Sequence, residues 1–170
     1  MVFNNMKTLI ILRHAKSSWD YPELSDYERP LNSRGNKDAE MMSLKLSERL
    51  DHIDCAISSS SKRTELTYEY FKNKINFKSE LFTHELYHAS SKKIISIIKN
   101  TNSDINSLMV LGHNPGLTDI VNLLTNYHLY NLPTTGIIII KFDITSWNKI
   151  SELDFKGDLE WIKFPKDYKL

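Results

Sequence analysis

The sequence contains a single cysteine, Cys55, among its 170 residues. One cysteine cannot form an internal disulfide, so a disulfide framework is excluded and a reducing compartment is favoured. Cys55 is better explained as a small buried hydrophobe than as a reactive thiol. Residues 1–7 lack the basic segment, apolar stretch and cleavage site of a secretory signal. We therefore expect a cytoplasmic protein.

Long apolar runs and an excess of one charge are also missing. The longest aliphatic runs, residues 9–12 and 137–140, are far shorter than the roughly 20 residues that span a bilayer, so no membrane partner is expected. The 22 lysines and arginines nearly balance the 21 acidic residues, and the formal net charge is +1. No overall field attracts nucleic acid, and any preference for anions must come from a local site.

No repeat, charge block or linker rich in proline, glycine and serine divides the chain. Its 41% of hydrophobic residues can build a full core without disulfide or metal support. We expect a single domain over residues 1–170. The sequence carries no signal of the oligomeric state.

Short apolar runs alternate with segments of helical period, which is typical of β-α-β units and a largely parallel sheet. The expected strands are residues 8–12, 55–58, 108–111, 136–142 and an edge strand at 159–164, with a weak strand or irregular segment at 81–86. Four helices are expected. The first follows a cap at Asn32 or Ser33, and the second follows a cap by the Ser61 hydroxyl. The third begins at residue 91, and the fourth has Asn114 as its cap and Pro115 as its first residue. The fold class is therefore α/β, with three α/β/α layers.

Two histidines, His14 and His113, each come directly after a predicted strand. Arg13 precedes the first, and Arg63 lies just beyond a third strand. Ligands of open α/β sheets bind at the carboxyl ends of the strands, so these residues converge if the strands adjoin. Guanidinium groups donate bidentately to phosphate oxygens, and neutral imidazole can attack phosphorus. The pattern predicts a phosphate pocket with a histidine nucleophile.

Four short segments, in the same order, resemble the histidine phosphatase superfamily. Residues 12–16, LRHAK, are similar to its RHG-type signature, with alanine in place of the usual glycine. Residues 58–67, SSSSKRTELT, resemble its segment of serines, a phosphate-binding arginine and a threonine, and residues 112–115, GHNP, resemble the segment of its second histidine. Residues 26–31, DYERPL, are similar to a stretch of the short SixA-type branch, whose members are linked to phosphohistidine removal.

This resemblance implies a phosphoglycerate mutase-like fold and a metal-independent, cofactor-free phosphatase that forms a phosphohistidine intermediate on His14. It implies a transition-state donor at His113. The implied phosphate-binding residues are Arg13, Arg29, Arg63 and Asn114. The loops are short and no long insertion covers the pocket, so phosphohistidine on a protein is the expected substrate. A small phosphomonoester is the alternative.

Two carboxyl groups compete for the role of proton donor to the leaving group. Asp26 matches the acidic position of the SixA-type branch, whereas Glu85 lies where many members of the superfamily place an acid. A donor must stay partly protonated near neutral pH, through burial or neighbouring charge. We expect Glu85 to be the donor, because Asp26 can instead orient Arg29. Each can also be a plain surface carboxylate.

Residues 84–88, HELYH, match the H-E-x-x-H pattern of zinc proteases. That chemistry needs His84 and His88 on one helix face, the glutamate as base and a third protein ligand. Position 94, where metzincins have a third histidine, holds isoleucine, and no glutamate occurs in residues 89–150. A zinc hydrolase is therefore a remote alternative.

Overall fold

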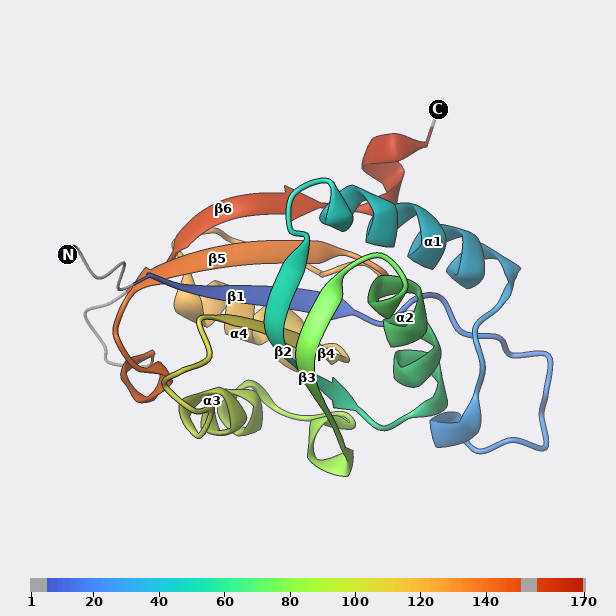
Figure 1. Cartoon of the computed structure of the whole chain (residues 1–170). Helices are drawn as coiled ribbons and strands as arrows, with labels where there is room; N and C mark the ends of the chain where they lie inside the picture. The colour runs from blue at the N-terminus through green and yellow to red at the C-terminus, as the bar shows by residue number, and fades with distance from the viewer. Residues whose placement is uncertain (1–5, 151–155, 170) are drawn as a thin grey trace.

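A computed structural model describes residues 6–150 and 156–169 of the chain (Figure 1). The strands that it contains form one sheet in the order β3-β2-β4-β1-β5-β6. Their bounds are β1 Met6–Arg13, β2 His52–Ser59, β3 Asn76–Thr83, β4 Ser107–Gly112, β5 Ile137–Asp143 and β6 Asp158–Lys163. β1 pairs with β4, and β2 with β3 and β4, in parallel, while β5 is antiparallel to β1 and β6. The prediction of a largely parallel sheet is confirmed.

Helices cover both faces of this sheet. Their bounds are α1 Ser33–Ser47, α2 Lys62–Lys72, α3 Ser91–Lys99 and α4 Gly116–Leu124. Figure 1 shows α1 and α2 on one side of the sheet and α3 and α4 on the other. The predicted three layers and the α/β class are confirmed.

The central strand β1 contributes to both cores. Leu9 and Ile11 pack with the buried residues of α3 and α4, and Ile10 and Leu12 pack with those of α1 and α2. Successive side chains of a strand point to opposite faces of the sheet, so a strand buried on both sides is apolar throughout. This explains why the uninterrupted apolar run of β1 predicts its place correctly.

The edge strand β3 differs from its prediction. It begins at Asn76, whereas the sequence indicated only a weak element at residues 81–86. Most residues of β3 are exposed, so the strand has little of the apolar pattern by which a buried strand is found. Cys55 in the neighbouring β2 is also only half-buried, so its prediction as a buried hydrophobe is corrected.

Two predicted helix starts are also corrected. Ser61 occupies the N-cap position of α2, but its hydroxyl makes no capping bond and instead contacts the hydroxyl of Thr64 at 2.9 Å. α4 begins at Gly116, so Pro115 is its N-cap and Asn114 lies outside the helix. Asn32, one of the two predicted caps of α1, does accept a hydrogen bond from the backbone of Gly35 at 2.8 Å.

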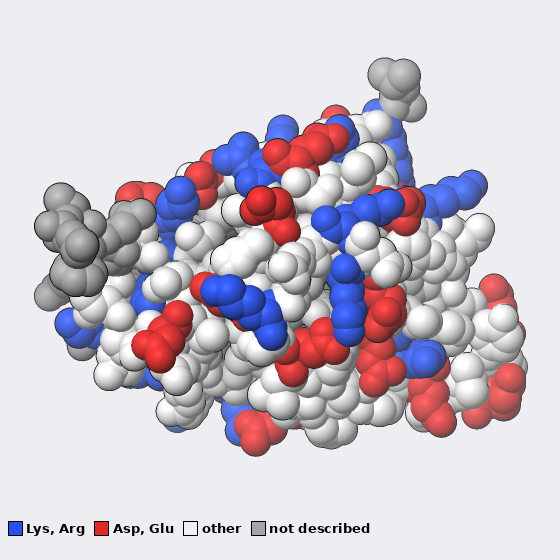
Figure 2. Space-filling model, viewed as in Figure 1, with Lys and Arg blue, Asp and Glu red and all other residues white. Residues whose placement is uncertain are grey.

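No helix within residues 6–150 and 156–169 is long and apolar enough to cross a membrane. Figure 2 shows lysine and arginine side chains interspersed with aspartate and glutamate over the face that carries the edge strand β3. This mixing agrees with the nearly balanced charges of the sequence.

Candidate active site

The parallel pairing of β1 with β4 brings the two predicted catalytic histidines together. Arg13 pairs with Gly112 at the ends of these strands, so the residues that follow, His14 and His113, are neighbours. Their ring centroids are 5.0 Å apart. β2 lies on the other side of β4, and the chain after β2 enters α2, which carries Arg63. The predicted convergence is confirmed.

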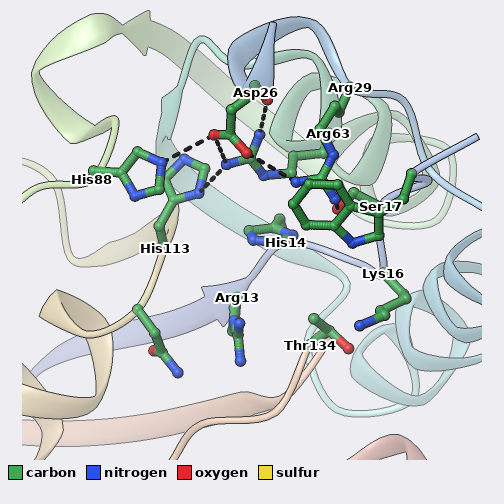
Figure 3. A pocket seen from close by; sticks show the side chains of 12 residues that line it. Arg13, His14, Lys16, Ser17, Asp26, Arg29, Arg63, His88, His113 and Thr134 are labelled. Carbon is green, nitrogen blue, oxygen red and sulfur yellow. Dashed lines mark hydrogen bonds and ion pairs between the residues drawn. The ribbon is translucent and has the colours of Figure 1, made fainter. Parts of the chain in front are cut away.

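These residues line a cleft of about 250 Å³ (Figure 3). The cleft is formed mainly by histidine, arginine and other polar side chains. Its lining consists of Arg13, His14, Lys16, Ser17, Trp19, Asp26, Arg29, Arg63, His88, His113, Asn114 and Thr134.

His14 is held as a neutral imidazole with one nitrogen left unprotonated. Its Nδ1 lies 2.8 Å from the carbonyl oxygen of Ala15, and because a carbonyl only accepts, Nδ1 carries the hydrogen. Burial, together with the nearby Arg63, Arg13 and Arg29, lowers the pKa of His14 to about 3. Nε2 therefore has a free lone pair at neutral pH, which is the state that a nucleophile requires.

Ala15 stands where the superfamily signature has glycine, and the fold accommodates its methyl group. The residue is fully buried and packs with Leu31 and Ala39. Its backbone N–H donates to the hydroxyl of Thr67 at 2.9 Å. The substitution therefore fills a small apolar cluster beneath the cleft.

Three guanidinium groups surround the imidazole of His14. Arg63 and Arg29 are almost fully buried. Arg13 donates to the carbonyl of Leu132 at 2.7 Å, and burial together with the positive charge of Arg63 lowers its pKa. Like charges so close together repel each other, and a bound dianion would relieve that repulsion. The cleft is thus an anion site within a chain of almost neutral net charge.

Asp26 orients two of these arginines. Its Oδ1 accepts from Arg29 at 2.9 Å, and its Oδ2 accepts from Arg63 at 3.0 Å, from the hydroxyl of Tyr87 at 2.6 Å and from Nε2 of His88 at 3.1 Å. Burial alone would raise the pKa of Asp26, but these hydrogen bonds and the charge of Arg63 outweigh it and hold the pKa well below its usual range. Asp26 is therefore an ionised acceptor, as expected for a residue that orients Arg29.

His113 is neutral and receives a hydrogen bond from an arginine. Arg63 can only donate, so the contact of 3.4 Å to Nδ1 leaves this nitrogen unprotonated. Nε2 lies 2.9 Å from the hydroxyl of Ser59 and carries the hydrogen. Burial and the neighbouring His14 and Arg63 lower the pKa of His113 to about 2.

Asn114 lines the cleft, but both hydrogens of its amide are already used. The amide nitrogen donates to Oδ1 of Asn131 and to the carbonyl of Leu132, each at 2.9 Å. The same carbonyl accepts from Arg13. The structure therefore gives Asn114 a positioning role for the loop that holds Arg13, in place of the predicted donation to phosphate.

Glu85 lies outside the cleft, which corrects its placement as the expected proton donor. Its carboxylate forms an ion pair with Lys93 at 2.7 Å, and its side chain is 59% exposed. It lines a separate, more apolar cavity beside Cys55 and Leu81.

Residues 84–88 do not form the helix that the zinc-protease pattern requires. His84 to Leu86 is a single 3-10 turn, and Tyr87 is extended. His84 packs against the ring of Tyr27, whereas His88 turns into the cleft. Within the described part of the chain, no three side chains of histidine, cysteine, aspartate or glutamate are grouped to hold a metal ion.

The sequence-based reasoning missed several cleft residues, of which His88 and Trp19 are the most prominent. Trp19 is 74% exposed, and its ring lies 3.3 Å from the guanidinium carbon of Arg29, a cation–π contact at the rim. The sequence suggests His88 only as a zinc ligand. The available signal was its position in the segment where the superfamily places an acid.

Comparison with known proteins supports this description of the fold. No family model matches the chain. An uncharacterized chloroplastic protein of Arabidopsis thaliana is 28% identical over 163 residues, which cover 89% of this chain and 73% of that protein. A structure named as the phosphohistidine phosphatase SixA of Nakamurella multipartitia has a TM-score of 0.82 at 18% identity and covers 94% of this chain and 96% of that one. The protein histidine phosphatase SixA complexed with tungstate has a TM-score of 0.78 at 22% identity, with coverage of 95% and 99%.

The chain therefore has the phosphoglycerate mutase-like fold of these structures, as the resemblance in the sequence predicts.

Proposed function

We propose that the chain is a metal-independent phosphatase that forms a phosphohistidine intermediate on His14 and removes phosphate from phosphohistidine on a protein. The tautomer of His14 is the observation that carries the proposal. Its Nδ1–H is bound by the carbonyl of Ala15, so Nε2 is free to attack. The arginines of the cleft supply the positive charge that a phosphoryl group needs.

In the first step, the lone pair of Nε2 attacks phosphorus in line with the leaving group, and the bond from phosphorus to the leaving nitrogen or oxygen breaks. Arg13, Arg29 and Arg63 stabilise the charge on the equatorial oxygens, and the site is already organised before the substrate arrives. The dianion also favours protonation of His113: its Nδ1 takes a proton from solvent, gives up the hydrogen bond from Arg63, and then donates to a phosphoryl oxygen. In the second step, water attacks phosphorus, the bond to Nε2 breaks, and inorganic phosphate leaves.

The size of the cleft supports a phosphorylated side chain as substrate. Its volume of about 250 Å³ lies below the roughly 300–1,000 Å³ of sites that enclose small molecules. Exposed Trp19 at the rim gives a flat surface for a ring. Two structurally similar proteins are named for phosphohistidine or protein histidine. A small phosphomonoester is the second candidate, since the cleft can hold the phosphoryl group of either substrate.

A rapid-quench experiment tests the mechanism. The protein is mixed with p-nitrophenyl phosphate in excess EDTA, and the His14 peptide is analysed by mass spectrometry. We expect phosphate on His14 and continued turnover without metal. His14→Ala should abolish turnover and leave the circular dichroism spectrum unchanged. A His14→Ala variant that retains most activity would exclude the proposed nucleophile.

A substrate comparison tests the preference. Release of phosphate is measured from a chemically phosphorylated histidine protein and from small phosphomonoesters, and we expect the higher kcat/KM for the protein. Loss of all activity on chelation, with recovery on addition of zinc, would revive the zinc hydrolase alternative with His84 and His88.

A further inference from the structure

His88 has no task in the reaction described so far, although it lies at the cleft. Its ring stacks on that of His113, with centroids 5.1 Å apart and planes at 25° (Figure 3). His113 in turn lies 5.0 Å from His14. The side chain of His88 is 52% exposed, whereas that of His14 is buried. The three imidazoles therefore lead from buried His14 to the exposed side of the cleft, where a phosphorylated substrate would enter.

The carboxylate of Asp26 fixes the ring of His88. The contact of 3.1 Å joins Nε2 to Oδ2, and because an ionised carboxylate only accepts, Nε2 carries the hydrogen. Nδ1 has no hydrogen bond in the described part of the chain, and the residue lines the cleft. A carboxylate that binds one ring nitrogen and leaves the other for proton transfer is the usual arrangement of a histidine acid or base.

The backbone also holds His88 in this position. Its φ of 50° lies in the left-handed region, which a residue with a Cβ enters at an energetic cost and which is often found at functional sites. The next residue, Ala89, packs against the start of α4, where a Cβ on Gly116 would lie 2.0 Å from the carbonyl oxygen of Ala89. Glycine at position 116 thus allows the close approach that keeps His88 at the cleft.

We propose that His88, held by Asp26, is the proton donor to the leaving group. The role rests on the proposed phosphatase function. Neither carboxyl suits it, because Asp26 is ionised and accepts four hydrogen bonds, and Glu85 points into a different cavity. Histidine is also the side chain most often used for proton transfer in catalysis.

The proton balance follows from the two steps. His88 begins the cycle as the imidazolium, with hydrogens on both ring nitrogens. As Nε2 of His14 bonds to phosphorus, the bond from phosphorus to the leaving atom breaks, and the proton on Nδ1 of His88 moves to that atom. Neutral His88 then takes a proton from the attacking water, whose oxygen bonds to phosphorus while the bond to Nε2 of His14 breaks. A donor of this kind protonates alkoxide leaving groups as they depart. The enzyme could therefore also hydrolyse alkyl phosphomonoesters.

The experiment compares leaving groups. Wild type, His88→Asn and His88→Gly are assayed on p-nitrophenyl, phenyl and alkyl phosphates, with His84→Ala as the control. His84 lies in the same turn and does not line the cleft. Asparagine and glycine both tolerate the left-handed backbone, and thermal unfolding confirms that each variant is folded.

We expect both His88 variants to lose about 100-fold or more in kcat/KM on alkyl phosphates and less than about fivefold on p-nitrophenyl phosphate, whose leaving group needs no acid. The plot of log kcat/KM against leaving-group pKa should steepen. Free imidazole should restore much of the alkyl phosphatase activity of His88→Gly, which a purely structural role would not allow. His84→Ala should behave as wild type.

Equal losses on every leaving group, without rescue by imidazole, would overturn the donor role and leave the phosphatase function standing. Wild-type protein that turns over neither p-nitrophenyl phosphate nor phosphohistidine would overturn the phosphatase function itself.

Discussion

A single carboxylate organises most of the charged groups of the cleft. Asp26 accepts hydrogen bonds from Arg29, Arg63 and His88, so one side chain sets the direction of two proposed phosphate-binding groups and of the proposed acid. Preorganised donors stabilise a transition state without having to reorient during the reaction. The same carboxylate would repel a phosphate dianion if its partners were removed. The contribution of Arg29 and Arg63 to phosphate binding therefore depends on their pairing with Asp26.

Arg63→Ala tests this dependence. The variant loses a buried donor pair and leaves the charge of Asp26 uncompensated beside the phosphate. We expect kcat/KM on p-nitrophenyl phosphate to fall by about 100-fold or more, the scale of losing one preorganised donor. Arg63→Lys keeps the charge but loses the planar fork, so most of the loss should remain.

Arg34→Ala is a matched control for Arg63→Ala. Arg34 is also the second residue of a helix and is also paired with an aspartate, Asp38, but its side chain is 63% exposed and does not line the cleft. The activity of Arg34→Ala should equal that of wild type. A fall of only about twofold for Arg63→Ala would place its guanidinium outside the reacting centre.

At the scale of elements, the loop after β1 depends on the start of α1. The carbonyl of Lys16, two residues after His14, accepts from the backbone of Asn32 at 2.9 Å. A Cβ on Gly35 would lie 2.1 Å from the same carbonyl oxygen. A backbone atom cannot move aside as a side chain can, so the first turn of α1 and the loop after β1 fit together only with glycine at position 35.

Gly35→Ala should therefore destabilise the protein and reduce its activity. Helix propensity alone would favour alanine by up to about 1 kcal/mol, whereas overpacking costs about 1–3 kcal/mol. The clash is with the main chain, so we expect the second effect to win. Urea titration should show a lower midpoint for Gly35→Ala and a midpoint close to wild type for Lys37→Ala, an exposed position in the same helix. A more stable Gly35→Ala protein would contradict the close packing.

The sequence predicts those elements whose burial on both faces requires an uninterrupted run of apolar residues. β1 and β4 are buried on both faces, and each ends directly before a histidine, so both strands and His14 and His113 could be placed. β3 is an exposed edge strand without that pattern, and its start was missed. The direction of side chains in the turn at residues 84–88 depends on Asp26, 62 residues from His88 in the chain. No local pattern could therefore show that His88 enters the cleft and Glu85 leaves it.

At the scale of the whole molecule, the site makes the free energy of unfolding depend on pH. His14 and His113 are both neutral in the folded protein, with pKa values of about 3 and about 2. In the unfolded chain, each would take up a proton near the ordinary histidine pKa of about 6.5. The unfolded state then binds more protons, so the free energy of unfolding falls as pH drops below about 6.5. The stabilisation is complete above that pH and is lost progressively towards pH of about 3.

Urea denaturation at several pH values measures this effect. Each of the two histidines should lower the free energy of unfolding by about 1.4 kcal/mol between about pH 7.5 and about pH 5.5. The low pKa values of Asp26 and Asp54 affect stability only at more acidic pH, because an unfolded aspartate titrates near about pH 3.9. His14→Gln and His113→Gln should each remove about half of the slope contributed by the pair, whatever their absolute stability. An unchanged slope in both variants would show that the two imidazoles take up protons at the same pH in the folded and the unfolded protein, which would contradict their low pKa values in the cleft.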